Sequence, residues 1–185
     1  MKVIGIQTSP NKDGLTATIA QMALDGAASA GAQTELVHLK AANIEACRQC
    51  DNGWGRCRRE GNCIIEDDFE ALRQRMATAD AFVISTPVYF GDVSEVTKAF
   101  LDRLRRCERN TESPSLKGTP VLSIAAAGGG GGGGPTCLVS LDRYYSVLKW
   151  PVFDSMIVTR RSREYMLVAA RAAGEKFVEH VKQQK

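Results

Sequence analysis

The chain has 185 residues, a formal net charge of +3, 44% hydrophobic residues and 24% charged residues. These proportions are typical of an ordinary globular domain that buries a hydrophobic core without the help of disulfide bonds. We therefore expect one domain over residues 1–185. The charge is too small to indicate nucleic-acid binding, and no apolar run approaches the ~20 residues of a membrane span. We expect a cytoplasmic protein without nucleic-acid or membrane partners, and a reducing compartment argues against disulfides.

Segments typical of strands and of helices alternate along the chain. Apolar residues recur with the helical period in the intervening segments, and Asp67 and Asp68 stand where acids favour the start of a helix. This alternation predicts an α/β fold, a three-layer sandwich with right-handed crossovers and helices on both faces of a parallel sheet. Five continuous apolar runs have the length of buried parallel strands: 2–8, 34–40, 81–88, 120–127 and 152–159.

The loops that follow these strands contain the unusual features of the sequence. In sheets of this kind, ligands bind beyond the carboxyl ends of the strands, where the strand order reverses. We therefore expect the cysteine-rich loop at 41–66 to lie at the same edge of the sheet as a bound ligand. The four loops that leave these ends are 8–16, 41–66, 86–92 and 127–136.

The first of these loops, TSPNKDGLT at residues 8–16, leads directly into a helix. Hydroxyls, a glycine and free backbone N–H groups at a helix N-terminus form an anion site that the helix dipole favours. The loop lacks the Walker pattern and the G-x-G-x-x-G fingerprint, which argues against nucleoside triphosphates and Rossmann-type NAD binding. A single terminal phosphate is the expected ligand. The alternative is a capped turn with Thr16 in the first helical turn.

Two further loops are suited to a planar ring. The loop at 86–92 carries Tyr89 and Phe90 beside a proline and a glycine, so it can lie along a flat apolar group. These aromatics can equally be core or interface residues. The last loop has seven consecutive glycines, Gly128–Gly134. Glycine lets the backbone approach a ligand closely, whereas the alternative is a low-complexity flexible linker.

Three stretches resemble the flavodoxin-like NAD(P)H-dependent FMN reductases and, with the cysteine loop, the iron–sulfur flavoproteins. They are TSPNKDGLT, then CRQC…C…C followed by IIEDDF, and AFVISTPVYFGDVSEVTKAFLDR. The resemblance implies a flavodoxin-like sheet of order 2-1-3-4-5 and bound FMN. It also implies a homodimer or homotetramer, because relatives of this fold complete their flavin pockets across subunits.

The same resemblance assigns roles to residues of the three loops. Relatives often carry a basic residue where Asn11 stands, and Lys12 can substitute for it. The residues assigned to the FMN phosphate are Thr8, Ser9, Asn11, Gly14, Leu15 and Thr16. Those along the isoalloxazine ring are Pro87, Val88, Tyr89, Phe90 and Gly91, and those at its pyrimidine edge are Gly128, Gly129 and Gly130.

The candidate metal ligands are four cysteines with the spacing C-x2-C-x6-C-x5-C: Cys47, Cys50, Cys57 and Cys63. This spacing matches neither common ferredoxin pattern, and zinc usually takes two close pairs where one is present here. Nearby arginines can offset the charge of a thiolate-ligated cluster or contact the phosphate of a nicotinamide cofactor: Arg48, Arg56, Arg58 and Arg59. A [4Fe–4S] cluster is our hypothesis, and zinc and free or redox-active thiols are the alternatives.

These features predict an FMN-dependent oxidoreductase with a cluster next to the flavin. Electrons would pass from NAD(P)H or a ferredoxin-like donor to a small acceptor such as a flavin or a quinone. The cofactor carries the redox chemistry, so no side chain is predicted to be catalytic. The alternatives are an electron-transfer carrier like flavodoxin and a zinc-stabilised interaction domain.

Overall fold

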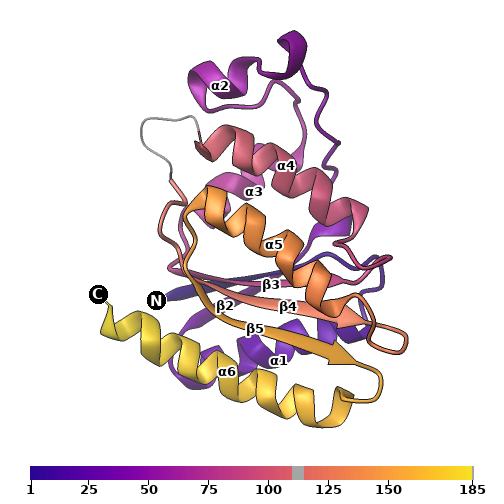
Figure 1. Ribbon diagram of the computed structural model, residues 1–185. Coiled ribbons are helices and arrows are strands. Elements are labelled where there is room, and N and C mark those ends of the chain that lie inside the picture. Colours follow the sequence, from indigo (N-terminus) through magenta and orange to yellow (C-terminus); the bar gives the residue numbers. More distant parts are fainter. Residues whose placement is uncertain (110–114, 185) are drawn as a thin grey trace.

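The computed structural model describes residues 1–109 and 115–184 and contains a five-stranded parallel sheet between two layers of helices (Figure 1). The strand order is β2-β1-β3-β4-β5, and each neighbouring pair is parallel. The predicted α/β sandwich and its strand order are therefore confirmed. The strands are β1 (Lys2–Gln7), β2 (Gln33–His38), β3 (Ala81–Pro87), β4 (Val121–Ala127) and β5 (Val152–Thr159).

The helices cover both faces of the sheet, as continuous apolar strands require. Every residue of the central strands β3 and β4 is buried. On one face lie α1 (Leu15–Ser29) and α6 (Arg163–Gln183), and on the other lie α3 (Asp68–Met76), α4 (Glu95–Arg109) and α5 (Gly134–Leu148). No helix in the described ranges is long and apolar enough to cross a membrane.

Two glycines bring α1 and α6 into direct backbone contact. A Cβ atom on Gly26 would lie 1.9 Å from the Arg171 carbonyl oxygen, and one on Gly174 would lie 1.9 Å from the Ala23 carbonyl oxygen. No other residue type fits at either position without a shift of the backbone. This close contact therefore fixes how α1 and α6 pack against each other on one face of the sheet.

The segment between β2 and α3 is the most irregular part of the described chain. It contains three short helical pieces: η1 (Leu39–Ala41), η2 (Asp51–Gly53) and α2 (Arg56–Glu60). The turn after Cys50 has left-handed backbone at Asp51 (φ 49°) and Asn52 (φ 56°), a conformation that non-glycine residues rarely adopt. Figure 1 shows the part of this segment around α2 beyond α4, on the side away from the sheet.

Candidate functional site

The loops that follow β1, β3 and β4 meet at the carboxyl edge of the sheet. The Thr8 N–H donates to the Ser85 carbonyl at 3.1 Å, and the Ser85 hydroxyl donates to the Thr16 carbonyl at 3.0 Å. The Val88 N–H donates to the Ala126 carbonyl at 2.9 Å. These bonds fasten each loop to its neighbour, so the predicted phosphate and ring loops lie at one edge.

The loop after β1 is shaped by the buried side chain of Gln7. Its amide accepts from the Ser9 N–H at 2.8 Å, donates to the Ser9 carbonyl at 3.2 Å, and contacts His38 Nδ1 at 2.7 Å. The Ser9 hydroxyl in turn accepts from the Asn11 N–H at 3.2 Å. Gln7 therefore sets the path of the loop, a role that its place at a strand end does not reveal in the sequence.

The helix that follows this loop begins without a side-chain cap. Its N-cap residue is Gly14, and no acidic residue stands in its first turn. A Cβ atom on Gly14 would lie 3.2 Å from the Asn11 side chain, so the glycine allows the loop to fold tightly. The N–H groups of the first helical turn lack intrahelical partners. An uncapped N-terminus of this kind favours an anion.

Four buried hydroxyl groups connect the first loop to the third. Thr97 Oγ1 lies 2.6 Å from Thr8 Oγ1 and 2.9 Å from both Thr86 Oγ1 and Ser94 Oγ. All four side chains are at most 1% exposed. Both the N–H and the hydroxyl of Thr8 have protein partners, so Thr8 holds the loops together from beneath. Ser94 and Thr97 were not predicted from the sequence, because they stand at the start of a helix and resemble ordinary capping residues.

The loop after β3 is a tight turn with an exposed aromatic tip. Tyr89 and Asp92 exchange backbone hydrogen bonds at 2.9 and 3.0 Å, and Phe90 (φ 51°) and Gly91 (φ 81°) are both left-handed. Phe90 is fully exposed and Tyr89 is 41% exposed. Neither is a core residue, which removes one of the alternatives for these aromatics and leaves ligand or interface contact.

The glycine run has two parts with different surroundings. A Cβ atom on Gly128, Gly129 or Gly130 would meet nothing within 4 Å, whereas one on Gly133 (φ 81°) would lie 2.5 Å from the Gly91 Cα atom. The later glycines therefore allow the third and fourth loops to pack together, and the Thr136 hydroxyl supports the contact by donating to the Gly91 carbonyl at 2.6 Å. The first part faces open space at the edge of the sheet.

The cysteine loop extends away from the sheet edge at which it starts. It starts at the carboxyl edge, but its thiols line a cavity together with residues of α4. Arg103, which lines the same cavity as the cysteines, stands six residues after Thr97, which is about 9 Å along the helix. The cavity therefore extends along α4 away from the edge, whereas Cys47 also lines a pocket with Glu95, the first residue of that helix. A position of the cysteines beside the ligand stays a prediction. A loop of this length is not confined to the edge at which it begins.

The four predicted ligands are brought to one cavity. Cys47, Cys50, Cys57 and Cys63 line it together with Cys107 of α4. All are free thiols, and the four loop cysteines are partly buried. Burial raises the pKa of the Cys107 thiol to about 12, so this thiol stays neutral in the wall of the cavity.

The thiols fit a four-cysteine metal centre by their chemistry more than by their present spacing. Four unpaired cysteines on one cavity are the ligand set of an iron–sulfur cluster or of zinc. However, no three His, Cys, Asp or Glu side chains among residues 1–109 and 115–184 are grouped closely enough to hold a metal ion. The cavity measures about 20 Å³, which is room for about one water molecule. The thiols must therefore move to bind a cluster.

Arginines surround the cavity, but they are not all those that were predicted. Arg48, Arg56, Arg103 and Arg106 line it. Arg48 and Arg56 are exposed and paired with Glu45 at 2.7 Å and Glu60 at 2.6 Å. Arg103 and Arg106 were not predicted, because they lie beyond β3, on α4. A signal did exist, because Arg103 stands between Phe100 and Cys107 at the spacing of the apolar stripe.

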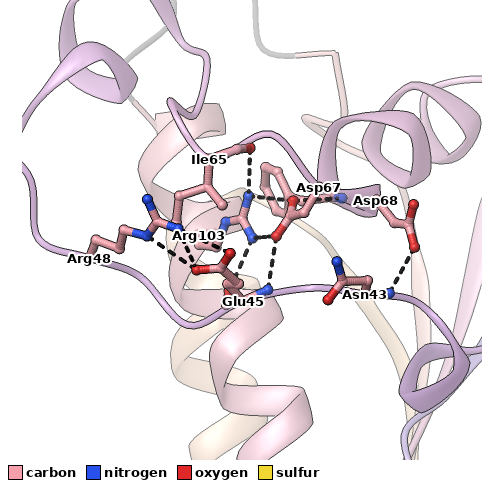
Figure 2. Close-up of polar contacts among 8 residues, drawn as sticks. Asn43, Glu45, Arg48, Ile65, Asp67, Asp68 and Arg103 are labelled. Atoms are coloured by element: carbon pink, nitrogen blue, oxygen red, sulfur yellow. Dashed lines mark hydrogen bonds and ion pairs between the residues drawn. The ribbon is translucent and has the colours of Figure 1, made fainter.

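The two flanks of the cysteine loop are joined by the groups drawn in Figure 2. The Asn43 N–H donates to Asp68 at 2.7 Å, and the Glu45 N–H donates to Asp67 at 2.8 Å. Asp67 also caps α3 by accepting from the Phe69 N–H at 3.1 Å, as its position in the sequence predicts. The loop is therefore closed at its base.

Comparison with known proteins places the chain in a family. A family model described as NADPH-dependent FMN reductase matches residues 1–162. An iron-sulfur flavoprotein of Methanocaldococcus jannaschii is 38% identical over 105 residues, which are 57% of this chain and 52% of the relative. One of Archaeoglobus fulgidus is 32% identical over 118 residues, which are 64% of this chain and 50% of the relative. The chain thus spans about half the length of these curated relatives.

Solved structures share the fold at low sequence identity. A flavone reductase superposes with a TM-score of 0.78 at 19% identity, covering 98% of this chain and 63% of its own. An NAD(P)H:quinone oxidoreductase from Methanothermobacter marburgensis superposes with a TM-score of 0.76 at 18% identity, covering 96% of both chains. With the match over residues 1–162, these findings show that the chain belongs to the NADPH-dependent FMN reductase family of flavodoxin-like oxidoreductases, together with the iron-sulfur flavoproteins.

Proposed function

We propose that the chain binds FMN at the carboxyl edge of the sheet and acts as an oxidoreductase toward a small acceptor such as a flavin or a quinone. The observation that carries this proposal is the junction of three loops. The uncapped N-terminus of α1, the turn at Tyr89–Asp92 and the open glycines Gly128–Gly130 lie at one edge. An anion site beside an apolar turn and exposed backbone N–H groups suits a phosphorylated planar ring.

In this proposal each loop contacts one part of the flavin. Backbone N–H groups of Leu15 and Thr16 and the Ser9 hydroxyl bind the phosphate, with Asn11 shaping the loop around it. Pro87 to Gly91 lie along the ring. The N–H groups of Gly128, Gly129 and Gly130 stabilise negative charge at the polar edge of the ring. FMN supplies the transfer of electrons, and the protein orients it and limits the access of water.

We further propose that the cysteine cavity holds a [4Fe–4S] cluster. Support comes from the four free thiols on one cavity and from the names of the curated relatives. The position of this cavity against α4 separates it from the flavin loops of the same chain. A surface cluster of this kind suits single-electron delivery by a ferredoxin-like donor, while NADPH is the donor that the family description suggests.

A homodimer or homotetramer is part of the proposal. Phe90 is fully exposed at the tip of the third loop, and Tyr89 beside it is 41% exposed. A large apolar side chain at such a position commonly marks an interface. A second copy that covers Phe90 would exclude water from the flavin edge. Analytical ultracentrifugation of the wild type and of Phe90→Ser tests this, because a monomeric wild type contradicts the proposal.

The test of the enzymatic function is turnover by the FMN-loaded protein. We expect steady-state oxidation of NADPH or NADH with a quinone acceptor, or reduction of the bound flavin by a reduced ferredoxin followed by rapid oxidation by the quinone. A flavin that is reduced by a one-electron donor but does not pass electrons to any small acceptor would instead support the electron-carrier alternative.

A further inference from the structure

Arg103 is a charged side chain buried in the wall of the cysteine cavity. Its side chain is 1% exposed, and it comes from the middle of α4 rather than from the cysteine loop. Charged residues are almost never buried this fully unless their polar atoms are paired. The partners of each of its nitrogen atoms therefore indicate what the residue is placed to do.

The terminal nitrogens of Arg103 have a complete set of partners (Figure 2). Nη1 donates to Asp67 Oδ2 at 2.5 Å and to the Glu45 carbonyl at 3.0 Å. Nη2 donates to Asp67 Oδ1 at 2.8 Å and to the Ile65 carbonyl at 3.5 Å. A guanidinium group has five N–H donors, and these contacts account for the four on the terminal nitrogens.

The fifth donor, Nε–H, is buried and has no acceptor among the described residues. An unpaired buried donor costs about 1–3 kcal/mol, and such groups in a native protein call for an explanation. The ring of Phe69 covers the guanidinium at 4.2 Å, so one face of the group is closed by an apolar contact. Because the terminal nitrogens are held by Asp67 and two carbonyls, the Nε edge is the part that remains for a ligand of the cavity.

The surroundings of this edge are thiols. Arg103 lines the cavity together with all four loop cysteines. Cys63 stands two residues before Ile65, whose carbonyl accepts from the Arg103 Nη2. An anionic sulfur atom is the acceptor that this arrangement offers.

We propose that the Arg103 Nε–H donates a hydrogen bond to a sulfur atom of the iron–sulfur cluster held by these cysteines and thereby raises the reduction potential of that cluster. The proposal rests on the cluster assigned under the proposed function. Reduction adds one negative charge to a cluster, and an N–H···S bond with a fixed positive charge stabilises the reduced form more than the oxidised form. Arg103 is a positioning residue, since it also holds both flanks of the loop.

The experiment compares variants in which the structural role and the hydrogen bond are lost separately. Asp67→Asn weakens the anchoring of the loop but keeps the Arg103 Nε–H. Arg103→Met in the Asp67→Asn background removes the donor without leaving an unpaired buried carboxylate. Arg105→Met removes a charge from the same helix outside the cysteine cavity. The measurements are iron and sulfide per chain and the cluster midpoint from an anaerobic titration followed by electron paramagnetic resonance.

We expect the double variant to have a lower midpoint than Asp67→Asn alone. When both variants are held at the midpoint potential of Asp67→Asn, we expect the ratio of reduced to oxidised cluster to be at least tenfold lower in the double variant. This corresponds to a shift of about 59 mV for one electron. Arg105→Met keeps the wild-type midpoint, and Asp67→Asn, which removes a negative charge beside Arg103, does not lower it. Should the double variant not fold, Arg103→Lys keeps the charge but has no donor at the Nε position, and we expect its midpoint to fall as well.

Two results would overturn the inference, and they differ in what else they remove. In the first result, the cluster is present and its midpoint is the same in the wild type, in Arg103→Lys and, where it folds, in the double variant. This would contradict the hydrogen bond but not the cluster. In the second result, the wild-type protein binds FMN but contains no iron or sulfide. This would contradict both the cluster and the role of Arg103.

Discussion

At the scale of single residues, the pair Arg103–Asp67 has a structural role that is independent of any cofactor. The Asp67 side chain is fully buried and accepts hydrogen bonds from Arg103 and from two backbone N–H groups. Burial raises the pKa of the Asp67 carboxyl, but these bonds lower it more, so that it lies below its usual value. The ionised form is therefore the one that the folded protein stabilises.

We predict that Asp67→Asn lowers the free energy of unfolding by about 3–5 kcal/mol at neutral pH, because it leaves the buried Arg103 charge unpaired. A depressed pKa contributes stability above the unfolded-state value, which is about 3.9, and this contribution is lost as the pH falls through the folded-state pKa. The wild type and the variant should therefore converge in stability at acid pH. Urea unfolding at pH 7 and at pH 3 measures both effects.

Asp68→Asn is the matched control for this prediction. Its carboxylate is exposed and accepts from the Asn43 N–H at 2.7 Å, so we expect a loss of less than about 1 kcal/mol. Equal losses in the two variants, or a difference between the wild type and Asp67→Asn that does not change with pH, would contradict the account of the ion pair.

A second residue-scale prediction separates the two parts of the glycine run. Gly133→Ala adds a Cβ atom 2.5 Å from the Gly91 Cα atom at a left-handed position, so we expect a loss of about 1–3 kcal/mol of stability. Gly129→Ala meets nothing within 4 Å and should change stability by less than about 0.5 kcal/mol. If Gly129 contacts the flavin, its variant should still bind FMN more weakly.

Thermal unfolding and FMN titration measured on both glycine variants decide this prediction. The two alanine variants share the same chemical change and the same loop, so each is the control for the other. An unchanged FMN affinity in Gly129→Ala would argue that the open half of the run is a linker and not a ligand contact.

At the scale of elements, α1 and α6 offer a test in which packing opposes helix propensity. Alanine favours a helix over glycine by about 1 kcal/mol, yet Gly174→Ala would place a Cβ atom 1.9 Å from the Ala23 carbonyl oxygen. We predict that the variant is less stable than the wild type by at least about 2 kcal/mol, because the two helices must separate. Chemical denaturation measures this, and a stabilised variant would contradict the packing.

The elements also show how far local sequence patterns reach. Apolar runs predicted each strand start to within one residue, because burial on both faces imposes a continuous pattern. β2 ends before its predicted end because Leu39–Ala41 form a 3-10 turn. The path of the cysteine loop could not be predicted, since it depends on bonds from α4 to residues far away in the sequence. Arg103 has the spacing of the apolar stripe of its helix, but its partners Glu45, Ile65 and Asp67 lie far away in the sequence and could not be predicted.

The candidate site was predicted to a similar extent. The three loops that were predicted to bind the flavin meet at one edge, because topology places the carboxyl ends of parallel strands there. The buried hydroxyls beneath them were not, since Thr8 and Thr97 meet only in the folded chain at 2.6 Å. Local patterns thus reveal which segments surround a site, whereas long-range contacts decide which side chains face it.

At the scale of the whole molecule, two candidate centres lie at different places on one fold. The loops of the proposed flavin site stand at the carboxyl edge of the sheet, and the cysteine cavity is formed by the cysteine loop and by Arg103, Arg106 and Cys107 of α4. A substitution at one centre should therefore remove its cofactor without removing the cofactor at the other centre. We expect a Cys57→Ser variant to lose iron while retaining FMN and its visible flavin spectrum, as measured by cofactor analysis of the purified protein.

The central claim is that one chain carries both FMN and a four-iron cluster. The most direct test is the absorption spectrum of protein purified without oxygen, combined with FMN, iron and sulfide analysis. We predict one FMN and about four iron and four sulfide ions per chain, as a [4Fe–4S] cluster requires. A flavin spectrum without iron would contradict the cluster and leave a plain FMN reductase, and stoichiometric zinc with neither flavin nor iron would contradict the whole account.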